Sequence, residues 1–84
     1  MEKTFRQFAI EYMTSNGMFE QHAKEVFGEI QNDPANDPMI GRWNDSVSEY
    51  PDIMQNVLAA SVKRCAKEWI EKNMPMAWYR PMFD

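Results

Sequence analysis

The stretch that follows Pro51 constrains this chain more than any other, because it contains no helix-breaking residue until Pro75. Pro51 suits the first position of a helix, where its missing N–H is not needed, and Asp52 suits the positive end of the helix dipole. Apolar and small residues recur there at helical spacing, at Met54, Leu58, Ser61, Cys65 and Trp69. We therefore predict one long helix over residues 51–73.

The apolar face of this helix is wide. Ile53, Val57 and Ala60 flank the main stripe, and the small residues of "LAAS" allow another helix to approach closely. The chain has 84 residues, which is enough for one domain with a modest core. A face of this width exceeds what one pair of helices covers, so we expect self-association.

The first part of the chain predicts a helical hairpin over residues 4–31. Thr4 and Gln7 have the spacing of a capping box at a helix start. Two apolar stripes follow, one made of Phe5, Phe8, Ala9, Tyr12 and Met13 and the other of Phe19, Ala23, Val26, Phe27 and Ile30. The sequence "SNG" separates them, and Gly17 suits the left-handed conformation that ends helices.

Residues 32–50 predict an acidic irregular connection. Each Asp-Pro step in "QNDPANDP" disfavours helix, so we predict a loop from Asn32 to Pro38. After it we expect a short helix or turns anchored by Trp43. Most of the net charge of −4 comes from this region, where Arg42 is outnumbered by Asp33, Asp37, Asp45, Glu49 and the adjacent Asp52. Such a segment attracts a basic surface and repels nucleic acid, so no direct nucleic-acid binding is expected.

The last residues, 74–84, form a tail rich in large apolar side chains, namely Trp78, Tyr79, Met82 and Phe83. One interpretation is that the tail packs back on the helices and completes a small core. The other is that Trp78, Tyr79 and Arg80 belong to an interface, because these residue types dominate binding hot spots. Together the segments predict an all-α fold, a small bundle of three main helices in a single domain.

The composition also indicates in which cellular compartment the chain is expected. A small secreted domain normally carries several cysteines, whereas Cys65 is the single cysteine here. No apolar stretch has the length of a signal peptide or a membrane span. We therefore expect a reducing cytoplasm and no membrane association.

Catalytic motifs are not evident. His22 is the single histidine, and its spacing from Glu25 is one isolated copy of a ligand pattern. A structural zinc site needs four Cys or His ligands. The glycines at Gly17, Gly28 and Gly41 match neither the P-loop nor the dinucleotide fingerprint. We expect no enzymatic activity, and no catalytic, cofactor-binding or metal-ligating residues.

The second half of the chain, with "GRW", then "EYP" before a helix that contains "EWI", then "AWYRPMF", resembles small proteins encoded by bacteriophages and prophages. The resemblance implies an accessory protein acting in the cytoplasm of a bacterial host. Inhibitors of host defence of the anti-CRISPR type are similar in size, acidity and lack of enzymatic motifs. With 9 basic against 13 acidic residues, the chain departs from the strongly acidic DNA mimics among them.

Three functional hypotheses follow from these patterns. The first is a protein-binding inhibitor that blocks a basic or assembly surface of a host defence complex, with partner-binding residues Asp33, Asp37, Asp45, Glu49, Trp78, Tyr79 and Arg80. The second is a homo-oligomer that sequesters a nucleotide signal, with the aromatics stacking on the base and Arg64 or Arg80 holding a phosphate. The third is a purely structural homo-oligomer.

Overall fold

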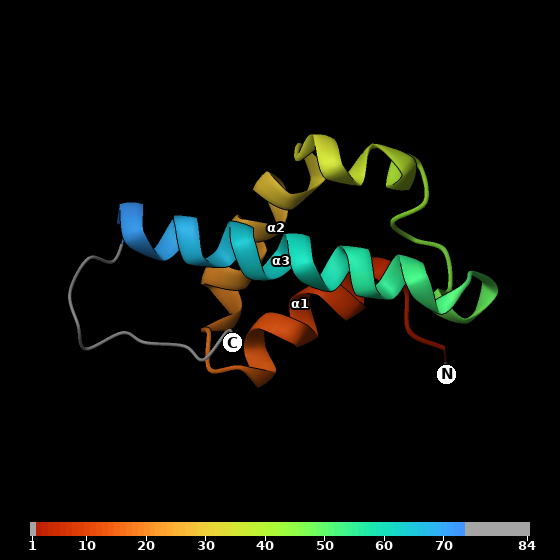
Figure 1. Ribbon diagram of the computed structural model, residues 1–84. Helices are drawn as coiled ribbons and strands as arrows, with labels where there is room; N and C mark the ends of the chain where they lie inside the picture. Colours follow the sequence, from red (N-terminus) through yellow and green to blue (C-terminus); the bar gives the residue numbers. More distant parts are fainter. Residues whose placement is uncertain (1, 74–84) are drawn as a thin grey trace.

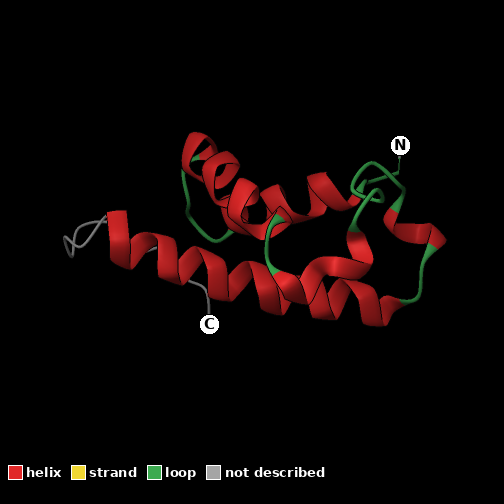
Figure 2. Cartoon of the chain, turned by 90° about the horizontal axis from the view of Figure 1, so that it is seen from above, coloured by secondary structure: helices red, strands yellow, loops and turns green. Residues whose placement is uncertain are grey.

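The computed structural model describes residues 2–73, which form three main helices and two short 3-10 helices (Figure 1). The helices are α1 (Phe5–Ser15), α2 (Glu20–Gln31) and α3 (Asp52–Asn73), with the 3-10 helices η1 (Pro34–Met39) and η2 (Val47–Glu49) between α2 and α3. The described part of the chain contains helices and loops and no strand (Figure 2). The predicted all-α class is therefore confirmed, whereas the predicted packing of the tail falls outside the described residues.

Helix α1 begins at the capping box that the sequence predicts. The Thr4 hydroxyl accepts a hydrogen bond from the N–H of Gln7 at 3.2 Å, and the Gln7 side chain accepts one from the N–H of Thr4 at 2.9 Å. After the helix ends, Gly17 has a φ of 103°, in the left-handed region that glycine adopts without strain. Both signals are local, so the bounds of α1 follow from its own residues.

The loop between η1 and η2 is attached to the beginning of α1. The N–H of Phe5 donates to the carbonyl of Asp45 at 3.2 Å, and that of Arg6 donates to the carbonyl of Trp43 at 3.0 Å. The first turn of an α-helix leaves its N–H groups without intrahelical acceptors, and this loop supplies them. Trp43 is 7% exposed and meets the ring of Phe27 edge-on, with 5.2 Å between centroids. The predicted anchoring role of Trp43 is confirmed.

The core lies between α1, α2 and α3. Its members from α1 and α2 are Phe5, Ala9, Met13, Ala23, Val26, Phe27 and Ile30, and those from α3 are Leu58, Ser61, Val62, Cys65, Ala66, Trp69 and Ile70. The predicted stripe of α3 is buried from Leu58 onward, but its width extends toward Val62 and Ala66 instead of Ile53 and Val57. The sequence does not show this direction, because it depends on the side from which α1 and α2 approach α3.

The segment predicted as a loop from Asn32 to Pro38 instead contains most of η1. The Asp33 carboxylate accepts from the N–H of Ala35 at 3.3 Å, and the carbonyl of Asp33 accepts from the N–H of Asn36 at 2.8 Å. Pro34 opens the 3-10 helix with a φ already suited to a tight turn. The Asp-Pro step that ends α2 therefore also starts η1.

Helix α3 begins at Asp52, one residue after the predicted start, and crosses most of the molecule in Figure 1. Pro51 lies just before it, and its carbonyl accepts from the N–H of Met54 at 3.0 Å. Among residues 2–73, neither α3 nor any other helix combines the length and the apolar character needed to cross a membrane.

Candidate functional site

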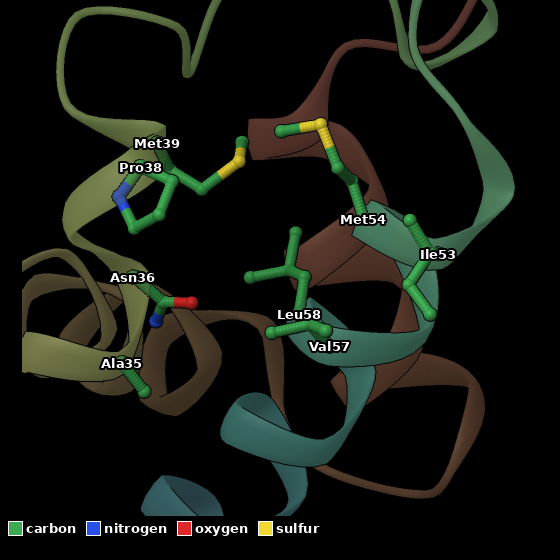
Figure 3. Close-up of a pocket in the computed structure, with 8 residues that line it drawn as sticks. All are labelled: Ala35, Asn36, Pro38, Met39, Ile53, Met54, Val57 and Leu58. Carbon is green, nitrogen blue, oxygen red and sulfur yellow. The ribbon is translucent and has the colours of Figure 1, made fainter.

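A groove of about 130 Å³ opens between η1 and the first turns of α3 (Figure 3). Side chains from the two elements face each other across it. Ala35, Asn36, Pro38 and Met39 line it from η1, and Ile53, Met54, Val57 and Leu58 line it from α3. Asn36 is the one polar residue among these eight, so the groove suits an apolar group.

Large apolar side chains remain exposed in and next to the segments that line this groove. Ile53 is 63% exposed and Val57 is 49% exposed, and both line the groove. Ile40, which follows the groove residue Met39, is 68% exposed. Exposed apolar side chains beside a groove, such as Ile53 and Val57, are a feature of protein interaction sites. The expectation that α1 and α2 leave part of the apolar face of α3 uncovered is confirmed at Ile53 and Val57.

Two exposed carboxylates flank the groove along the chain, and we call them the acidic rim. Asp37 lies in η1 between Asn36 and Pro38, and Asp52 begins α3 directly before Ile53. Complementary charge guides association and fixes the register of a bound partner. The acidic rim therefore favours a partner with basic residues beside its apolar contact.

Asp33, a predicted partner-binding residue, is bonded within the chain. Its carboxylate accepts from the Ser61 hydroxyl at 2.6 Å, pairs with the Arg64 guanidinium and accepts from the N–H of Ala35. The bond from Ser61 is the main reason that the pKa of Asp33 is lowered, and Arg64 adds to the effect. Since only 10% of the side chain is exposed, Asp33 has little capacity to bind a second protein.

The other predicted acidic residues differ in availability. The Asp45 carboxylate accepts from the hydroxyl of Tyr50 at 2.6 Å, and this bond raises the pKa of that phenol. Asp37 and Glu49 are exposed on η1 and η2. The predicted set therefore divides into two internally bonded and two exposed carboxylates. The remaining predicted contacts, Trp78, Tyr79 and Arg80, lie outside the described residues.

The region around Arg64 is electrostatically compensated. Its guanidinium pairs with Asp33 and lies 3.8 Å from a carboxylate oxygen of Glu68. The adjacent Cys65 is 5% exposed, and burial, reinforced by Asp33, raises the pKa of its thiol. A thiol of this kind stays protonated and is a weak nucleophile. Within the described residues, Arg64 therefore already has two carboxylate partners, and the thiol beside it is buried.

Asn36, which is 1% exposed, was not predicted from the sequence as a site residue. Its Nδ2 donates to the carbonyl of Ile30 at 2.9 Å and to the hydroxyl of Ser61 at 2.8 Å. Because a backbone carbonyl can only accept, these bonds fix which end of the amide is nitrogen. Its Oδ1 is buried and has no hydrogen-bond partner among the described residues. The one sequence signal was Ser61, a polar residue on an apolar stripe that needed a polar neighbour.

Residues 2–73 contain no group of three or more His, Cys, Asp or Glu side chains that could hold a metal ion. The groove between η1 and α3 is thus the main candidate site in the described part of the chain. Comparison with known proteins found no matching family model, no similar curated protein and no similar solved structure.

Proposed function

We propose that the chain is a non-enzymatic protein-binding module that uses the groove between η1 and α3. The observation that supports this proposal is the exposed apolar surface at Ile53 and Val57, next to an apolar groove. Burial of such surface drives most protein association. The acidic rim, Asp37 and Asp52, adds charge complementarity toward a basic partner.

The proposed biological role is inhibition of a bacterial defence complex by a phage-encoded protein. The resemblance in the second half of the chain supports this role, as does the apolar groove with exposed carboxylates at Asp37 and Asp52, next to lining residues in the sequence. The target surface is a basic or assembly surface of the complex. Asp37 and Glu49 remain in the proposed contact set, while Asp33 and Asp45 leave it because their carboxylates are bonded internally. Trp78, Tyr79 and Arg80 also remain proposed contacts.

The two alternatives have less support. A nucleotide-sequestering oligomer needs a free cation for the phosphate, and Arg64 is paired with Asp33 and Glu68. Arg80, the other predicted cation, lies outside the described residues. A structural homo-oligomer would cover the same apolar surface with a second copy. The molar mass of the chain in solution, measured over a range of concentrations, distinguishes the two cases. A homo-oligomer has a mass above that of the monomer without any other protein.

The test is capture from bacterial lysate by the tagged full-length chain, followed by mass spectrometry of the captured proteins and small molecules. Two variants of α3 form a matched pair. Val57→Lys places a charge at the groove, and Asn56→Lys places the same charge on the preceding residue, which is exposed and does not line the groove. We expect a stoichiometric bacterial protein with the unmodified chain and with Asn56→Lys, and its loss with Val57→Lys.

Equal capture by Val57→Lys and Asn56→Lys would show that the partner binds elsewhere. A captured nucleotide without any protein would favour the sequestering oligomer. Recovery of the chain alone, with a molar mass above that of a monomer, would favour the structural homo-oligomer.

A further inference from the structure

The two ends of the Asn36 carboxamide have different surroundings. Its nitrogen faces Ile30 and Ser61 and is fully used there. Figure 3 shows its oxygen turned toward Leu58, on the groove side of η1. This oxygen is buried without a donor among the described residues. A buried acceptor without a donor destabilises the fold, because its lost hydrogen bonds to water are not replaced. A ligand that donates to this oxygen forms a hydrogen bond and removes that penalty, and both effects strengthen binding.

We propose that the groove binds the indole of a tryptophan from a partner protein, with the indole N–H donating to Oδ1 of Asn36. This inference rests on the proposed protein-binding function and specifies the residue that docks. An apolar cavity of about 150 Å³ accommodates a benzene ring. The groove, at about 130 Å³ and open on one side, therefore accommodates the pyrrole edge of an indole. Ile53 and Val57 at its edge cover the remaining ring.

The hydrogen-bonding inventory of the side chains favours tryptophan over other anchors. An indole has one donor and no acceptor, so a single bond to Asn36 satisfies it completely. A tyrosine hydroxyl also carries acceptor lone pairs, and Nδ2 of Asn36, the one side-chain N–H donor among the lining residues, is already used by Ile30 and Ser61. A leucine leaves the oxygen of Asn36 without a donor. Tryptophan is also among the residues most enriched in binding hot spots.

Two methionines make access to this oxygen feasible. Met39 and Met54 lie on opposite sides of the groove, and their thioethers extend into the space between η1 and α3 (Figure 3). Methionine has three rotatable bonds and changes rotamer readily, and its sulfur makes favourable contacts with aromatic rings. When Met39 and Met54 change rotamer, Oδ1 of Asn36 becomes accessible to the indole. Their sulfur atoms can then pack against the indole ring.

The acidic rim specifies the neighbours of the tryptophan. Asp37 and Asp52 are exposed and each is adjacent in sequence to groove residues, one on η1 and the other on α3. An inserted tryptophan flanked by lysine or arginine would place positive charge near one or both carboxylates. The occupant is therefore a basic segment with a tryptophan at its centre.

The experiment measures binding of short peptides to the ¹⁵N-labelled full-length chain by NMR titration. The first probe is the blocked tripeptide Lys-Trp-Lys, and the second is the same peptide with the indole nitrogen methylated. The methyl group removes the donor and keeps the ring, so the comparison needs no change to the protein. We expect shifts at groove residues and at the side-chain amide of Asn36, with binding about tenfold weaker for the methylated peptide.

Further titrations and variants test which molecule binds in the groove. The peptide Glu-Trp-Glu should bind more weakly than Lys-Trp-Lys, by a factor that falls as salt is added. The Val57→Lys variant should lose binding and the Asn56→Lys variant should retain it. The chain itself carries Trp78 beside Tyr79 and Arg80, outside the described residues. A dilution series without peptide therefore tests whether a second copy occupies the groove.

Each contrary outcome has a distinct meaning. Equal affinity for the two indole probes, or no binding of either, overturns the proposed tryptophan contact. Shifts of groove residues on dilution identify a second copy as the occupant and overturn the partner-protein proposal. If a captured lysate protein depends on Val57 while the two probes bind equally, the protein-binding function stands and the tryptophan contact does not.

Discussion

The two ends of the contact between η1 and α3 have opposite character. At one end, Asp33 of the preceding loop bonds with Ser61 and Arg64, and we call this the closed end. At the other end, Ile53 and Val57 stand exposed beside the groove, which we call the open end. The same helix supplies both within three turns. The comparison shows that the fold satisfies its own polar groups at the closed end and leaves apolar surface uncovered at the open end.

Asn36 lies between the two ends and takes part in both. Its Nδ2 belongs to the closed end, where it reaches Ser61, and its Oδ1 is directed to the open end without a donor. A buried polar network that is satisfied rigidifies the structure around it. The closed end thus holds Asn36 in place, and the unused acceptor gives the open end its one specific polar feature.

The largest expected effect compares two valines of α3. Val62 is fully buried and Val57 is 49% exposed. Val62→Ala removes two buried methyl groups and leaves a cavity, so we expect a loss of about 2 to 3 kcal/mol in the free energy of unfolding. Val57→Ala should change it by less than about 0.5 kcal/mol. Urea unfolding followed by circular dichroism measures both, and equal losses would contradict an open groove.

The next effect concerns the closed end. Asp33→Ala removes the acceptor of Ser61 and Arg64 and the cap of η1, so we expect a loss of about 1.5 kcal/mol in the free energy of unfolding. Asp37→Ala, at an exposed position of η1, is the matched control and should cost less than about 0.5 kcal/mol. Similar unfolding curves for the two variants would mean that the closed end adds little stability.

A smaller effect is expected from pH. Because the pKa of Asp33 is lowered in the fold, its carboxylate contributes stability that is fully present above the ordinary value of 3.8. That contribution is lost as the pH falls through the lowered pKa. The difference in stability between the unmodified chain and Asp33→Asn should therefore be constant at neutral pH. It should become smaller as the pH falls below 3.8. Thermal unfolding in a series of acidic buffers measures it, and a difference independent of pH would exclude the ionised carboxylate as its source.

The smallest effect tests a polar contact away from both ends. Tyr50 donates to Asp45, and this bond raises the pKa of the phenol above its ordinary value of 10.0. Asp45→Asn removes the charge and should lower that pKa toward 10.0. The absorbance of tyrosinate on alkaline titration measures the change, with Tyr50→Phe identifying the contribution of this residue. An unchanged titration in Asp45→Asn would show that the contact is not maintained in solution.

The parts of this protein that could be predicted depend on neighbours in the chain. Thr4 and Gln7 are three residues apart, and their capping box formed as predicted. The long helix after Pro51 was predicted to within one residue at its start. Trp43 was recognised as an anchor because a large aromatic in an irregular segment needs burial. The interpretation of "QNDPANDP" as a loop was wrong in part, since tight turns satisfy the same proline constraints as a loop.

The candidate site was not predictable in the same way. Ser61 meets Asp33 and Asn36 across 28 and 25 positions of the chain. No local pattern distinguishes Asn36, which is buried, from Asn32, which is exposed. The charge count also treated Asp33 and Asp37 as equivalent, although the first is internally bonded and the second is free to meet solvent.

By itself, the sequence determined the helical class, the helix ends and the presence of an apolar face on α3, because capping, proline restriction and helical periodicity act over a few residues. The tertiary structure alone decided which side of α3 faces the core, which carboxylates remain available and that Asn36 keeps an unused acceptor beside the groove. Those properties depend on the direction from which α1, α2 and η1 approach α3. Packing among distant segments sets that direction, and residues near one another in the chain do not encode it.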